Sequence, residues 1–206
     1  MKHFTLIIKV IFIFFFQFAL SSCSKSSLSI PDYIGYVRSA DNGLTDFTVR
    51  NGYVFNVLYE PADYLALKEL RNEKVTVDKF FETRKKFSDY LYFDFSIKSE
   101  TSDKKVLDKN DSLNYEKHYN HFAFDFSKDI FLLTKEDTLR CLLHQLINSG
   151  DISPEYHFEV LFEKPDSLFI SCDSLVLVYD DKVLNSGKVI IPILTKDIKN
   201  VPQLKI

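Results

Sequence analysis

Alternating apolar and polar residues give the strongest secondary-structure signal in the chain. In "YLYFDFSI" (residues 90–97) every second residue from Leu91 to Ile97 is large and apolar, which predicts a half-buried β-strand. "HFAFDF" (residues 121–126) repeats this alternation and predicts a second strand. Further strands are indicated where β-branched and aromatic residues gather, in "YVFNVLY", "IFLL", "YHFEVLF", "SLFIS", "SLVLVY" and "KVIIPI".

Apolar residues recur at helical spacing in three other stretches. "EPADYLALKEL" predicts a short helix with Pro61 in its first turn. "TVDKFFETRKKF" predicts another, capped by Thr76 or Asp78. "TLRCLLHQLI" (residues 138–147) predicts a third helix, and a buried strand from Leu139 to His144 is the alternative.

The order of these elements predicts the fold class. Residues 98–119 are mostly polar and predict a long connection, and Asn185 and Gly187 supply turn signals between the last two strands. Many strands, regular turn signals and few helices favour a mainly β or α+β fold. We therefore predict an antiparallel β-sandwich-like domain with two or three short helices.

The first residues of the chain have the pattern of a secretory signal peptide. Lys2 provides a basic start, and Val10 to Phe16 form an unbroken apolar run. That run, even with its apolar extension to Leu20, is shorter than the roughly 20 residues that a membrane-spanning helix needs.

The end of this segment, "LSSC" (Leu20 to Cys23), resembles the lipobox of bacterial lipoproteins. The resemblance implies cleavage before Cys23, attachment of diacylglycerol to its thiol and acylation of the new amine. Two or more acyl chains hold a protein durably on a membrane. An ordinary cleaved signal with an incidental cysteine, or an uncleaved anchor, is the alternative interpretation.

These features divide the chain into a lipoprotein signal peptide (residues 1–22), a lipidated cysteine with a flexible tether (residues 23–30) and a single β-rich periplasmic domain (residues 31–206). The residue after Cys23 is Ser24 and not Asp. By analogy with lipoprotein sorting, this favours the outer membrane over the inner one. The tether also lacks the acidic cluster of surface-exported lipoproteins, so we expect the domain to face the periplasm.

Composition narrows the possible partners. Of the 26 basic side chains, Lys2 and Lys9 lie in the signal segment, which leaves 24 basic against 29 acidic side chains and a formal charge of −5. This balance argues against a nucleic-acid partner. With 20 Phe, 11 Tyr and only 5 Gly, the chain suits aromatic-faced strands better than a glycine-rich nucleotide-binding fold.

Two cysteines remain beside Cys23. Cys141 and Cys172 would lie in an oxidising compartment, which permits a disulfide if their Cα atoms approach within about 7 Å. Both are flanked by apolar residues, so buried free thiols are the alternative.

Motifs for catalysis and for cofactor binding are missing from the sequence. There is no G-x-S-x-G elbow, Walker loop or G-x-G-x-x-G. His118 and His121 have a possible metal-ligand spacing, but a strand at this point would turn them to opposite faces. Cys141 and His144 as a dyad would lack an oxyanion site. We therefore expect no catalytic residue, no metal site and no cofactor.

The tripeptide Asp-Ser/Thr-Leu occurs four times and resembles the acceptor motif for periplasmic O-glycosylation in some Gram-negative bacteria. The resemblance implies sugars on one or more of Ser112, Thr138, Ser167 and Ser174. The alternative is structural, because Asp-Ser pairs also occur at helix caps and turns.

The leading functional hypothesis is a non-enzymatic envelope protein, attached to the membrane through a lipid on Cys23 and binding a partner protein as an assembly accessory or an immunity-type lipoprotein. Two alternatives remain. One is a periplasmic hydrolase or metal-dependent enzyme with dispersed site residues. The other is a carbohydrate- or lipid-binding β-sandwich that uses its many aromatic residues.

Overall fold

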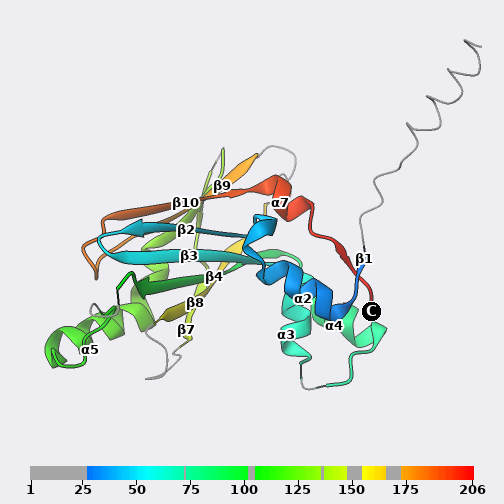
Figure 1. The fold of residues 1–206 in the computed structure, drawn as a ribbon, viewed down its shortest axis with the longest axis horizontal. Coiled ribbons are helices and arrows are strands. Elements are labelled where there is room, and N and C mark those ends of the chain that lie inside the picture. Colours follow the sequence, from blue (N-terminus) through cyan, green and yellow to red (C-terminus); the bar gives the residue numbers. More distant parts are fainter. Residues whose placement is uncertain (1–26, 72, 102–104, 136, 148–154, 166–172) are drawn as a thin grey trace, which may run out of the picture.

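The computed structural model describes residues 27–206, apart from residues 72, 102–104, 136, 148–154 and 166–172. Its main feature is a pair of packed antiparallel sheets, with helices gathered at their ends (Figure 1). Cys23, Ser167, Cys172 and the whole strand predicted at "SLFIS" lie outside the described residues.

The larger sheet has five antiparallel strands in the order β2-β3-β4-β8-β7. These are β2 (Thr45–Arg50), β3 (Tyr53–Glu60), β4 (Tyr90–Ser99), β8 (Tyr156–Glu163) and β7 (Leu143–Ile147). The β4 strand is the one predicted from the alternation at residues 90–97. Its burial alternates from Tyr90 to Phe95, because one face of the strand packs in the core and the other faces outward, and Ser96 on the second face is also buried.

The second sheet has four antiparallel strands in the order β10-β9-β5-β6. They are β10 (Lys188–Leu194), β9 (Ser174–Asp180), β5 (Ile130–Leu133) and β6 (Thr138–Arg140).

A two-stranded parallel ladder joins the beginning and the end of the described chain. It pairs β1 (Ser27–Leu28) with β11 (Gln203–Leu204).

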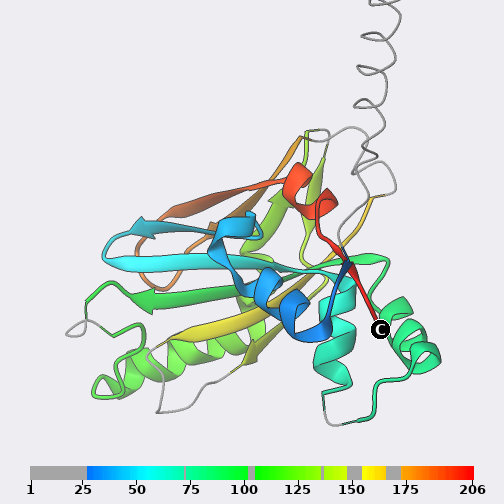
Figure 2. The same cartoon turned by 45° about the vertical axis from the view of Figure 1, so that its right-hand side comes forward.

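Five α-helices and three short helical turns complete the described chain. The helices are α2 (Ile30–Arg38), α3 (Ala62–Glu69), α4 (Val77–Lys85), α5 (Ser112–Asn120) and α7 (Thr195–Lys199), and the turns are η1 (Ala40–Asn42), η2 (His121–Asp125) and η3 (Phe126–Lys128). Both views show α2, α3 and α4 near the C-terminal segment, with α5 far from them (Figures 1 and 2).

Aromatic side chains fill the space between the two sheets. Phe95 on β4 lies 5.5 Å from Tyr179 on β9, measured between ring centroids. Phe126 stacks on Phe158 with centroids 4.0 Å apart and rings inclined by 10°, and it lies 5.0 Å from Tyr179. Because all four rings are fully buried, their apolar area and mutual contacts hold one sheet against the other.

The antiparallel β-sandwich-like fold class is confirmed, whereas several element predictions are wrong. The helices α3 and α4 occur where they were predicted, but the described chain has five helices instead of two or three. One of the additional helices, α5, occupies part of the predicted connection at residues 98–119. Asp111 caps this helix, and its side chain accepts a hydrogen bond from the Asn114 amide.

Residues 121–126 form helical turns instead of the predicted strand. Phe122 and Phe126 are buried, and Phe124 between them is 73% exposed. Two apolar residues four positions apart fit one face of a helix as well as they fit every second position of a strand. The preceding helix α5 continues directly into this segment, so residues 121–126 adopt a helical and not an extended backbone.

Residues 138–147 form two strands instead of the predicted helix. β6 pairs with β5 in the four-stranded sheet, and β7 pairs with β8 in the five-stranded sheet. The chain changes sheets at Cys141 and Leu142. Leu142 and Leu143, which a buried helix face would cover, are 55% and 62% exposed.

The aromatic core predicts a sharp contrast between two neighbouring phenylalanines. We expect Phe126→Ala to lower the free energy of unfolding by about 3–5 kcal/mol, because it leaves a cavity between the sheets. Phe124→Ala changes an exposed ring and should cost less than about 1 kcal/mol. Urea unfolding measures both values, and equal costs would contradict this account of the core.

Candidate interaction surface and polar clusters

The outer face of the five-stranded sheet carries a row of polar residues. Strand alternation turns Asp94 and Ser96 on β4 outward, as it does His157 and Glu159 on β8. The register sets Asp94 opposite Glu159 and Ser96 opposite His157. Side chains that are distant in sequence therefore meet on one surface.

His157 is held between two carboxylates. Its Nδ1 atom lies 3.0 and 3.2 Å from the two carboxylate oxygens of Asp94, and its Nε2 atom lies 3.7 Å from Glu155 Oε2. The hydrogen bond to Asp94, supported by the charges of Asp94 and Glu155, outweighs partial burial and raises the pKa of His157 above its ordinary value.

A serine, a histidine and an aspartate occur together here, but the hydrogen bonds differ from those of a hydrolase triad. The Ser96 hydroxyl donates to Glu155 Oε1 at 2.7 Å, so its proton is directed at a carboxylate and not at the imidazole. In a triad of that kind the imidazole accepts the proton of the serine. The arrangement is that of an ion-pair network on a sheet face.

A second ion cluster joins α3 to the same face. Lys68 Nζ lies 2.9 Å from Glu60 Oε1 and 3.1 Å from Glu159 Oε1. Burial raises the pKa of the Glu60 carboxyl even though Lys68 opposes this shift. The cluster fixes the helix against the strands β3 and β8.

An exposed apolar edge borders this polar face. Among the described strands β7 pairs with β8 alone, so β7 forms one edge of the sheet. Leu143 and Ile147 point outward from it and are 62% and 39% exposed, and Leu142 precedes them. We call Leu142, Leu143 and Ile147 together the β7 edge. Exposed apolar edge strands are templates for pairing with another chain.

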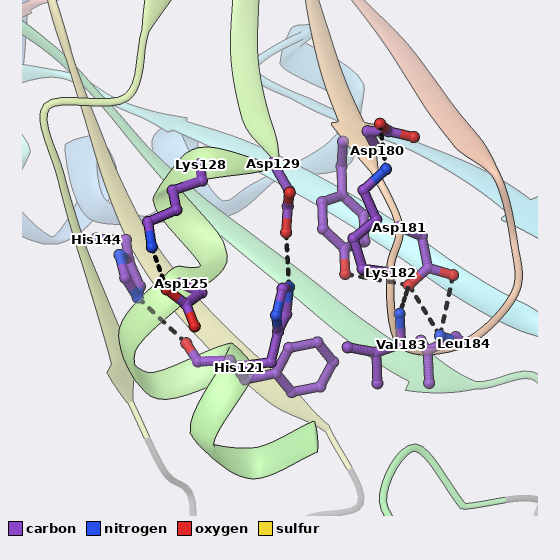
Figure 3. Close-up of polar contacts among 12 residues, drawn as sticks. His121, Asp125, Lys128, Asp129, His144, Asp180, Asp181, Lys182, Val183 and Leu184 are labelled. Carbon is purple, nitrogen blue, oxygen red and sulfur yellow. Dashed lines mark hydrogen bonds and ion pairs between the residues drawn. The ribbon is translucent and has the colours of Figure 1, made fainter. Parts of the chain in front are cut away.

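His144 and His121 have local structural contacts. His144, on the inner face of β7, places Nε2 3.2 Å from the Phe122 carbonyl oxygen and 3.1 Å from that of Ala123. His121 Nε2 lies 2.6 Å from Asp129 Oδ2 (Figure 3). His118 and His121 lie on successive helical segments, which corrects the expectation that a strand separates them.

The described residues contain no group of three or more His, Cys, Asp or Glu side chains arranged to hold a metal ion.

The turn between β9 and β10 is organised by a buried carboxylate. Asp181 accepts hydrogen bonds from the amides of Val183, Leu184 and Ser186 at 2.6–3.1 Å (the first two drawn in Figure 3). The Tyr179 hydroxyl donates to the same carboxylate at 3.2 Å. The Asp181 carboxylate therefore uses its hydrogen-bonding capacity within its own turn and toward Tyr179.

Three of the four predicted glycosylation positions lie within the described residues. Ser112 and Thr138 are exposed, at the starts of α5 and β6, whereas Ser174 is half-buried at the start of β9. The aspartates before Ser112 and Thr138 accept local backbone hydrogen bonds, as the structural alternative requires. Glycosylation stays a prediction.

Cys141 lies where the chain crosses between the sheets. Its Sγ atom is 3.0 Å from the Leu143 carbonyl oxygen, and burial raises the pKa of the thiol to about 11. A disulfide with Cys172 stays a prediction because Cys172 lies outside the described residues.

No protein-family model, curated protein or solved structure matches the chain. Within the described part of the chain no helix is long and apolar enough to cross a membrane.

The raised pKa of His157 predicts a stability contribution that depends on pH. Folding raises this pKa above the unfolded value of about 6.5. The stabilisation of the folded state by protonated His157 is therefore fully present below about pH 6.5. It is lost as the pH rises through the folded-state pKa. We expect Asp94→Asn to cost up to about 1 kcal/mol in acid and less in alkali, since the site is partly exposed.

Urea unfolding at an acidic and an alkaline pH measures this difference, and an NMR titration should show a lower pKa for His157 in the Asp94→Asn variant. The exposed Asp89→Asn substitution is the control. An Asp94→Asn cost that is the same at both pH values would contradict the role of the His157–Asp94 pair.

Proposed function

We propose that the chain is a lipid-anchored protein of the outer membrane that faces the periplasm and acts by binding a partner protein, without catalysis. The apolar β7 edge carries this proposal, because it exposes large side chains on an edge strand of the sheet. The resemblance of Leu20 to Cys23 to a lipobox supports the anchor.

The partner that suits the β7 edge is an extended segment that adds a strand to the sheet. Main-chain hydrogen bonds supply affinity in such complexes, and alternate side chains supply specificity. Leu143 and Ile147 share one face of β7, with Gln145 between them. A partner strand with apolar residues at alternate positions is complementary to this pattern.

A lipid anchor favours this mode of action. Tethering to a bilayer raises the effective concentration of one protein toward another protein on the same membrane. A weak contact along a short edge strand then suffices for association. The anchor thereby compensates for the small area that a five-residue strand offers.

The contacts of the described residues support the alternatives less well. The Ser96 hydroxyl is directed at Glu155, which disfavours a serine hydrolase at this cluster. The phenylalanines on the inner faces of β3, β4 and β8 are fully buried. They therefore form the core and provide no aromatic platform for sugars on the outer face.

The proposed partner site predicts position-specific crosslinking. A photoreactive benzoylphenylalanine at position 143 or 147 should crosslink in intact cells to one envelope protein, and the same residue at position 190 should not. Ile190, 49% exposed on β10, is a matched apolar control. With the purified pair, Leu143→Lys should weaken binding about tenfold or more, because it places a charge in an apolar contact.

Ile190→Lys should leave the affinity of the purified pair unchanged. The proposal fails if positions 143 and 147 give no specific adduct, or if position 190 gives the same adduct with the same yield.

The anchor is tested separately with Cys23→Ala. Radiolabelled palmitate should be incorporated into the wild-type protein but not into the variant, because the thiol is the predicted site of lipid attachment. The variant should leave the outer-membrane fraction or accumulate as a precursor. Labelling that persists in Cys23→Ala, or is absent from the wild type, would contradict the lipid anchor.

A further inference from the structure

A pocket of about 330 Å³ opens at the end of the domain where helices α2, α3 and α4 meet the C-terminal segment. Figure 1 shows these elements at one end of the sheets. The polar residues that line the pocket include Tyr33, Tyr59, Asp63, Arg84 and Lys164. The volume is at the lower limit of those that hold small organic ligands.

The Tyr33 hydroxyl is unusual because it is buried and has no hydrogen-bond partner among the residues that the structure describes. Buried hydroxyl groups are nearly always paired, since an unmade hydrogen bond is unfavourable once water is excluded. Tyr33 lines the pocket, so its unpaired hydroxyl lies in a residue next to the pocket and suggests an acceptor or donor there.

Burial raises the pKa of Tyr33 well above its ordinary range, and the Asp63 carboxylate adds to this shift while Arg84 opposes it. Burial likewise raises the pKa of Tyr59 to about 12. Both phenols are therefore protonated at neutral pH and can donate hydrogen bonds. Tyr33, Asp63 and Arg84 line the same pocket.

The charged groups of the pocket retain capacity for a ligand. Arg84 is ion-paired with Asp63, and the Lys164 ammonium donates to the Ser88 carbonyl oxygen. A guanidinium has five N–H donors and an ammonium has three, so these contacts occupy only some of them. Two cations against one carboxylate give the lining a formal charge of +1, although the chain as a whole is negative.

We propose that this pocket binds a small organic oxyanion, a carboxylate or a phosphate ester no larger than a monosaccharide, through the Tyr33 hydroxyl, Arg84 and Lys164. The oxyanion supplies the acceptor that Tyr33 lacks, and charge-assisted hydrogen bonds hold it. Phe87, Tyr90 and Val201 line the pocket and provide contact area for the body of the ligand.

Pairs of charged and neutral probes test this inference on the purified full-length chain in detergent. The pairs are benzoate with benzyl alcohol, phenyl phosphate with phenol, glucuronate with glucose, and glycerol 3-phosphate with glycerol. Calorimetry should give a Kd below about 1 mM for at least one anion. Its neutral counterpart should bind at least about tenfold more weakly, because it lacks the charge-assisted bonds.

Two substitutions connect this binding to the pocket. Tyr33→Phe removes only the unpaired hydroxyl and should weaken anion binding about tenfold without lowering thermal stability. Lys164→Gln should weaken it by a similar factor. Tyr36→Phe, on the same helix but outside the pocket lining, is the control and should bind as the wild type does.

The proposal is overturned if no anion binds, if each neutral probe binds as tightly as its anion, or if Tyr33→Phe binds the anion with unchanged affinity. Because Tyr33→Phe retains the ring that packs in the core, it tests the proposal even if Lys164→Gln fails to fold. The pocket does not include the β7 edge, so Leu143→Lys should leave anion binding unchanged.

Discussion

The stack of Phe126 on Phe158, with Phe95 and Tyr179 beside it, is the contact on which the arrangement of both sheets depends. Phe158 belongs to the five-stranded sheet and Tyr179 to the four-stranded sheet. Phe126 comes from the helical turn η3, and its ring contacts both. A strand that slipped by one residue would turn its buried rings into solvent. The core therefore fixes the register, and the register decides which residues reach the outer face. The polar row and the β7 edge are consequences of that packing.

The sequence predicts this fold best where one face of an element is buried and the other is not. The alternation at residues 90–97 predicts β4 because inward phenylalanines and outward polar residues obey a period of two. Residues 121–126 mislead because two buried phenylalanines four positions apart satisfy both periods. Residues 138–147 mislead for a different reason: leucines lie at helical spacing, yet the segment divides between two sheets and leaves Leu142 and Leu143 exposed. Tertiary pairing overrides the local pattern there.

The candidate sites depend on contacts that no local motif records. Asp94 and His157 are 63 positions apart, and their hydrogen bond requires the register between β4 and β8. Alternation alone does indicate that Asp94 and Ser96 share a face, but it does not identify the neighbouring strand. The pocket around Tyr33 likewise draws residues from several segments that meet only after folding. In contrast, the lipobox-like Leu20 to Cys23 can be recognised in sequence because signal processing acts on a short linear segment.

The proposed anchor lies close in sequence to a strand that pairs with a residue of the pocket. Gln203 lines the pocket and pairs directly with Ser27 in the β1–β11 ladder. Cys23 lies four positions before Ser27 in the sequence, so the covalent chain spans at most about 14 Å between them. In the lipid-anchored form that we propose, the pocket therefore lies at the membrane-proximal end of the domain. The β7 edge belongs to a different part of the sheet, so a ligand near the bilayer and a protein partner can occupy the domain together without competing for the same residues.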